Sequence, residues 1–169
     1  MIKIGVKEAW KKPKKTKPEK AHVKTDSNGF DHEHITDVCE NAIADILGVE
    51  INKGDGYDLI YKGLKIDVVA QSYQPEKQVS QIGDAYTGGL TPEQYDKHQN
   101  CDVYVFVRHN TGEENIWVGG WIKRDDFYAL CKFRAKDTNI GCITVKYDGH
   151  QIRFKQLKPF TELEGIAVD

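Results

Sequence analysis

Two aspartates stand in neighbouring halves of Tyr57–Gln71 (YDLIYKGLKIDVVAQ), a stretch whose pattern predicts two short strands around a turn. Asp58 and Asp67 would lie directly opposite one another across a two-residue turn and diagonally across a bulged turn, within roughly 5–8 Å in both cases. Carboxylates this close repel each other. The repulsion is relieved if one group stays protonated, if a cation such as Lys65 lies beside them, or if a divalent ion binds between them. Two separately solvated surface aspartates are the alternative that this spacing leaves open.

A divalent ion held by two aspartates has a defined chemistry. Oxygen ligands that leave other positions to water suit Mg²⁺, for which Mn²⁺ can substitute. Such an ion polarises a phosphoryl oxygen and lowers the pKa of its bound water, which promotes hydrolysis of a phosphodiester bond. The pair Asp58 and Asp67 is therefore a candidate metal-binding and catalytic site.

The first element that must position this pair is a helix predicted over residues 31–47. Asp31 is a suitable N-cap and Gly48 a suitable C-terminal stop. One apolar stripe at helical spacing is expected to face the core, and it comprises Ile35, Val38, Cys39, Ala42, Ile43, Ile46 and Leu47. Glu40 borders this stripe, so its carboxylate is expected at the rim of the core.

The predicted hairpin follows, with Lys62-Gly63 as its turn. Alternation in its second strand predicts a core face made of Ile66, Val68 and Ala70. The opposite face is expected to meet a polar environment, and it is made of Lys65, Asp67, Val69 and Gln71. Val69 is the one apolar residue in that row.

Later segments complete an α/β (α+β) pattern around one mixed sheet flanked by helices. Residues 72–100 are long for a plain connection and predict a functional loop with a short helix. Strands are expected over 102–108 and 115–122, then a helix over 125–134 whose inward residues are Phe127, Leu130 and Cys131. A terminal hairpin is predicted from residues 142–147 and 151–155 around Asp148-Gly149.

Charge is unevenly divided along the 169 residues. Residues 1–24 hold nine lysines and two glutamates, a net charge of +7, whereas residues 25–169 carry −9. We expect a basic arm over residues 1–24 and a single domain over residues 25–169. The arm either tracks a phosphate backbone or is a solubilising tail, and its candidate DNA-binding lysines are Lys11, Lys12, Lys14, Lys15 and Lys17.

The composition also excludes several classes of protein. No apolar run approaches the ~20 residues of a membrane span, and the N-terminus lacks the apolar segment of a secretory signal. The four cysteines are scattered without a C-x-x-C pair, which argues against a zinc site and favours free thiols in a reducing cytoplasm.

In order and spacing, these pieces resemble the PD-(D/E)XK, or restriction-endonuclease-like, nuclease superfamily. The resemblance covers roughly residues 31–135 and rests on the helix segment CENAIADILG with Glu40, on YDLI with Asp58, on KIDVV with Asp67, and on the later DVYVFV strand and GWI step. It implies that Asp58, Asp67 and the backbone carbonyl of Val68 hold Mg²⁺, that Glu40 binds a second metal directly or through water, and that DNA is the substrate. It also implies a homodimer that cuts both strands.

Val69 occupies the position at which the family carries its catalytic lysine. That lysine orients or activates the water and offsets developing negative charge, which valine cannot do. Gln71 could orient the water instead, or Lys65 could supply the charge from a migrated position. Alternatively, catalysis is lost and a binding module remains, or the chain is an engineered inactive variant.

Three functions follow from these observations. The first is an Mg²⁺-dependent endodeoxyribonuclease with Glu40, Asp58, Asp67, Gln71 and Lys65 as its candidate catalytic residues. The second is a catalytically inactive nuclease fold that binds DNA or regulates, which Val69 favours. The third is a protein-binding domain, which the −9 balance of residues 25–169 favours.

Overall fold

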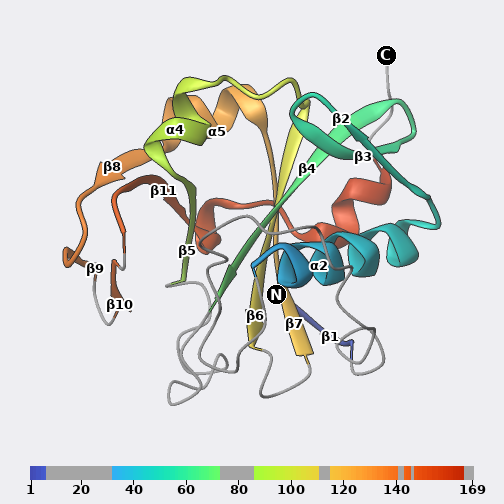
Figure 1. The fold of residues 1–169 in the computed structure, drawn as a ribbon, viewed down its shortest axis with the longest axis horizontal. Helices are drawn as coiled ribbons and strands as arrows, with labels where there is room; N and C mark the ends of the chain where they lie inside the picture. Colours follow the sequence, from blue (N-terminus) through green and yellow to red (C-terminus); the bar gives the residue numbers. More distant parts are fainter. Residues whose placement is uncertain (7–31, 73–85, 111–114, 141–142, 146, 166–169) are drawn as a thin grey trace, which may run out of the picture.

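The computed structural model describes residues 1–6, 32–72, 86–110, 115–140, 143–145 and 147–165 (Figure 1). The lysines predicted to form a DNA-binding arm lie outside these residues, as do residues 73–85 of the loop expected over 72–100. The helices are α2 (His32–Leu47), α4 (Pro92–Asp96) and α5 (Arg124–Leu130), with 3₁₀ helices η3 (Phe154–Gln156) and η4 (Phe160–Gly165). The strands are β1 (Ile2–Gly5), β2 (Ile51–Gly54), β3 (Tyr57–Tyr61), β4 (Leu64–Ser72), β5 (Thr87–Leu90), β6 (Val103–Asn110), β7 (Asn115–Lys123), β8 (Lys132–Arg134), β9 (Asn139–Ile140), β10 (Ile143–Thr144) and β11 (Gly149–Arg153).

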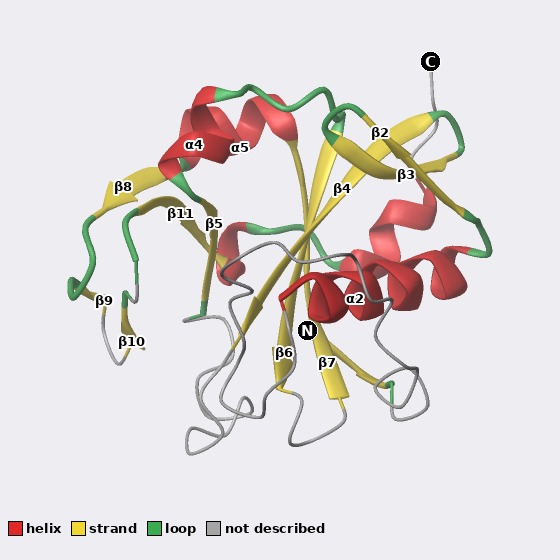
Figure 2. Ribbon diagram, viewed as in Figure 1, coloured by secondary structure: helices red, strands yellow, loops and turns green. Residues whose placement is uncertain are grey.

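The main sheet has six strands in the order β1-β7-β6-β4-β3-β2 (Figure 2). Among the described strands of this sheet, β4 and β6 are the pair that runs parallel, and the segment between them includes β5 and α4. The other neighbouring strands pair in antiparallel fashion. The expected mixed α/β architecture, a mixed sheet flanked by helices, is therefore confirmed.

Helix α2 forms where its apolar spacing predicted it and ends at Leu47, just before Gly48, whose φ of +66° favours glycine. Its apolar stripe packs on one face of the main sheet, where it meets the even-numbered residues of β4. The predicted burial is wrong for one residue of the stripe, because Ile46 is 40% exposed.

The other face of the main sheet carries a second apolar core, so the polar environment predicted for the odd-numbered side of β4 is wrong at Val69, whereas Asp67 and Gln71 line a cleft with polar residues. The second core is built from β6, α5, β5, β11 and η3, with Phe106, Phe127 and Phe154 at its centre. Val69 belongs to this core and is 8% exposed. Its apolar character is thus explained by packing.

A three-stranded sheet in the order β5-β11-β8 stands beside the main sheet. It overturns two predictions. The segment around Asp148-Gly149 does not close a terminal hairpin, because β11 pairs with β5 and β8 while β10 pairs with β9. The helix predicted over 125–134 ends at Leu130, which is 47% exposed, and residues 132–134 form β8.

Two further features bear on the predicted class of protein. Each helix in the described part of the chain is too short or too polar to cross a lipid bilayer. Cys39, Cys101 and Cys131 are free thiols, and the fourth cysteine lies outside the described residues.

Candidate functional site

The two aspartates of the predicted pair come from strands joined by a tight turn. Lys62 and Gly63 form this turn with φ values of 48° and 81°, the left-handed pair that a two-residue hairpin requires. The pairing of β3 with β4 ends at Leu59 and Ile66. The next residues in this register are Asp58 and Asp67, so the side chains predicted to face each other do lie on one side of the hairpin.

Asp58 is held against β4 by a hydrogen bond. The backbone N–H of Val68 donates to Asp58 Oδ2 at 2.8 Å, in place of a further rung of the β3–β4 ladder. In an antiparallel pair the N–H and C=O of one residue point to the same neighbouring strand. The carbonyl of Val68 therefore lies on the edge of β4 that carries Asp58.

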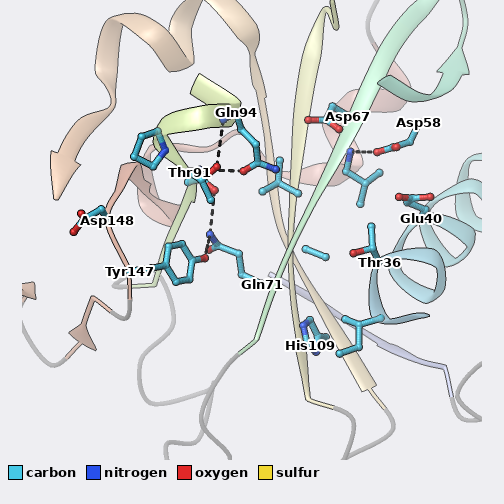
Figure 3. A pocket seen from close by; sticks show the side chains of 16 residues that line it. Thr36, Glu40, Asp58, Asp67, Gln71, Thr91, Gln94, His109, Tyr147 and Asp148 are labelled. Atoms are coloured by element: carbon cyan, nitrogen blue, oxygen red, sulfur yellow. Dashed lines mark hydrogen bonds between the residues drawn. The ribbon is translucent and has the colours of Figure 1, made fainter. Parts of the chain in front are cut away.

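Glu40 reaches the same region from α2 (Figure 3). Its carboxylate is buried, with the residue 2% exposed, so it lies deeper than the predicted rim of the core. Burial, followed by the charge of Asp58, raises the pKa of Glu40 to about 7. Lys53 on β2 acts in the opposite direction, with its Nζ 2.6 Å from Glu40 Oε2 and 3.2 Å from Asp37 Oδ1.

The three carboxylates interact through their charges. Burial raises the pKa of Asp67 well above its ordinary value, and the charges of Asp58 and Glu40 raise it further. Asp58 thus acts on both of its neighbours. A site that collects three acidic groups in a low-dielectric environment favours either protons or cations.

The donor set suits a hard divalent cation, because all three side chains offer carboxylate oxygens and the Val68 carbonyl lies at the same edge. Within the described residues, no group of three or more His, Cys, Asp and Glu side chains is already arranged as a metal site. The Glu40 carboxylate is also engaged in the ion pair with Lys53. Asp58 and Asp67 are therefore the residues best placed to hold a cation, with Glu40 available once Lys53 moves.

A cleft of about 740 Å³ runs along the edge of β4 past the three carboxylates. The three carboxylates lie toward one side, and the other side carries the amide and hydroxyl groups of Gln71, Thr91, Gln94 and Tyr147 together with the carboxylate of Asp148 (Figure 3). Gln71 is 9% exposed, and its Nε2 donates to the Gly89 carbonyl at 3.0 Å and to Tyr147 Oη at 2.7 Å. The predicted Gln71 and the predicted carboxylates thus line the same cleft, with Gln71 four residues further along β4 than Asp67.

The remaining predicted catalytic residue, Lys65, points elsewhere. Its Nζ lies 3.5 Å from Asn100 Oδ1 and 5.4 Å from the centre of the Tyr57 ring. Lys65 is not among the described residues that line the cleft.

Sequence reasoning missed two residues of this region. Lys53 carries no local signal, because its partner Glu40 lies on a helix and no periodicity relates the two elements. Tyr147 enters through the connection to β11, which sequence reasoning had assigned to a hairpin. His109, buried on β6, also lines the cleft.

Replacing Lys53 with methionine tests its effect on Glu40. The variant loses the cation that lowers the pKa of Glu40, so this pKa rises beyond its value of about 7 in the parent. We expect the free energy of unfolding at pH 8 to fall by roughly 1–2 kcal/mol, since half of the Lys53 side chain is exposed and its ion pair is partly screened. Denaturant unfolding at pH 8 and at pH 5 measures the free energy of unfolding of the parent and the variant. The difference between them should be smaller at pH 5, where Glu40 is protonated. Lys97→Met is the control, because its partner Glu93 is 79% exposed and the loss should stay below about 0.5 kcal/mol.

Comparisons of the chain with protein-family models, with curated proteins and with solved structures found no match.

Proposed function

We propose that the chain is a divalent-metal-dependent endodeoxyribonuclease that hydrolyses a phosphodiester bond in the cleft beside β4. The observation that carries the proposal is the convergence of Glu40, Asp58 and Asp67 from a helix and two strands, with Asp58 raising the pKa of both others. Repulsion among three such groups makes cation binding favourable, and a phosphodiester is a substrate that such a cation can activate.

The arrangement of elements also supports a restriction-endonuclease-like fold. The helix with Glu40, the hairpin with both aspartates and the later strand β6 follow one another along the chain, and β6 lies directly beside β4. This is the order of pieces on which the sequence resemblance rests.

Asp58 and Asp67 would hold Mg²⁺ or Mn²⁺, with the Val68 carbonyl as a third ligand and Glu40 as a further one. When bound, the cation would polarise a phosphoryl oxygen and increase the acidity of a bound water. The chain's own contribution is positional. The Val68 N–H fixes the Asp58 carboxylate, and two hydrogen bonds from Nε2 fix the plane of the Gln71 amide. Gln71 lies four residues beyond Asp67 on β4, about 13 Å away at 3.3 Å per residue, so its amide would contact a bound substrate rather than the water at the carboxylates.

A second candidate is a catalytically inactive module on the same fold that binds DNA. It is favoured by the absence of a cation at position 69, where the valine is packed into the second core, and by the position of Lys65 beside Asn100. Neither residue brings positive charge to the water that would attack the phosphate.

Cleavage of supercoiled plasmid DNA distinguishes the two candidates. We expect the parent chain to nick the plasmid in Mg²⁺ or Mn²⁺ and not in EDTA, and we expect Asp58→Asn to lose this activity. A parent that never cleaves, combined with a Val69→Lys variant that does, would reject the enzyme and leave the inactive fold. Thermal unfolding supplies a second readout, because Mg²⁺ should raise the melting temperature of the parent but not that of Asp58→Asn.

A further inference from the structure

The outer face of the β5-β11-β8 sheet carries a row of cations. Lys132 and Arg134 alternate along β8 and pair with Gln151 and Gly149 of β11. Residues paired across neighbouring strands point to the same side, so both cations share a face with Gln151. Arg153 lies two residues beyond Gln151 and joins this face.

Burial on the opposite side of this sheet fixes the direction of the row. Ile152 on β11 and Leu90 on β5 are buried in the second core, so the alternate residues of both strands must point away from it. Lys132 and Arg153 are exposed accordingly, and Arg134 is partly exposed.

A groove of about 350 Å³ runs over this outer face. Its described lining includes Lys132, Arg134, Arg153 and Lys155, the last contributed by η3, and it includes no aspartate or glutamate. The ion pairs in the described part of the chain involve Lys53, Lys97 and Arg124, and none of these four cations. In a chain with a net charge of −2, this groove concentrates positive charge that described carboxylates do not neutralise.

The groove and the carboxylate cleft meet at the ladder between β5 and β11. Gly89 lines the cleft, and its paired residue Gln151 lines the groove. Tyr147 and Asp148, just before β11, also line the cleft (Figure 3). An extended ligand can therefore pass from one hollow to the other over two adjacent strands, which lie about 4.8 Å apart.

We propose that the row Lys132, Arg134, Arg153 and Lys155 binds the phosphate backbone of duplex DNA, a segment of which reaches the cleft. This inference rests on the proposed function, and it assigns the DNA-binding surface to the folded domain in addition to any contribution from the lysine-rich arm. Lys132 and Arg134 are two residues apart on β8 and so lie about 6.6 Å apart. Together with Arg153 at the end of β11 and Lys155 on η3, they offer several cations to a repeating anion. Phosphate contacts of this kind position the duplex without reading its sequence.

Fluorescence anisotropy with a labelled 30-base-pair duplex of random sequence, in EDTA and over a range of salt concentrations, tests the proposal on the full chain. The double variant Lys132→Gln, Arg153→Gln removes two contacts, so the slope of log affinity against log salt should fall by about 2 and affinity at 0.1 M salt by tens of fold. Arg134→Gln with Lys155→Gln is an independent pair that should give the same result. The control is Lys97→Gln with Lys123→Gln, two exposed lysines outside the groove whose loss changes the net charge equally.

A groove variant that binds no more weakly than the control overturns the proposal, as does a parent chain without measurable affinity in low salt. Cleavage is scored separately in Mg²⁺. If the parent binds DNA through the groove but never cleaves it, the DNA-binding surface is supported and the nuclease function is rejected. If the parent cleaves DNA and its groove variants bind and cleave normally, the nuclease function is supported and the DNA-binding surface is rejected.

Discussion

Replacing Asp67 with asparagine is expected to abolish cleavage and, at the same time, to stabilise the metal-free chain. Cleavage should fall by at least about 100-fold, because the variant loses a carboxylate that holds the cation. The free energy of unfolding in EDTA at pH 8 should rise by about 1–3 kcal/mol, because the variant no longer ionises a buried group beside two other acids.

The opposite signs of these two effects arise from one property of the site. The charge on Asp67 is unfavourable in the folded chain because of burial and because of Asp58 and Glu40. A cation would reverse that balance, so the group that destabilises the metal-free fold is the one on which metal binding depends. Under the proposed function, the stability of the metal-free chain is exchanged for cation binding at this position.

Plasmid nicking and denaturant unfolding of the same two proteins measure the pair of effects. Asp45→Asn is the control, because Asp45 is exposed on α2. Its replacement should change neither the cleavage rate nor the free energy of unfolding by much. An Asp67→Asn chain that is less stable than the parent in EDTA would show that the carboxylate is held by favourable contacts and would contradict the proposed site.

The stability of the metal-free chain is expected to decrease as the pH rises from about 4.5 to about 7. The pKa of Glu40 is raised from 4.5 to about 7 in the folded chain, so over this range the folded state retains a proton that the unfolded state has released. Stability therefore falls by about 1.4 kcal/mol per pH unit and by roughly 3 kcal/mol in total, then levels off above the folded-state pKa. Asp67 contributes in the same direction, since its pKa is also raised.

Urea unfolding between pH 4 and pH 8.5, with EDTA present, measures this dependence. Glu40→Gln should flatten the curve and be more stable than the parent at pH 8, because the amide cannot ionise. Glu50→Gln is the matched control at an exposed position and should keep the slope of the parent. A parent whose stability rises over this interval would mean that Lys53 dominates the environment of Glu40, contrary to its raised pKa.

Local patterns in the sequence determined the elements that carry the three carboxylates. The helical spacing of α2 and the left-handed turn at Lys62-Gly63 depend on contacts within a few residues, so both were predicted with nearly the observed bounds. Alternation then placed Asp58 and Asp67 on one side of the hairpin. The prediction of the carboxylate pair needed no more than this.

Tertiary structure decided what surrounds each face, because periodicity identifies the sides of an element but not what covers them. Val69 became a core residue because distant segments, β5, β11 and α5, contribute to the same second core. Residues 132–134 became a strand because β11 supplied hydrogen-bonding partners that outweighed the local helical pattern. Lys53 reached Glu40 only because β2 and α2 pack together, which no local spacing records.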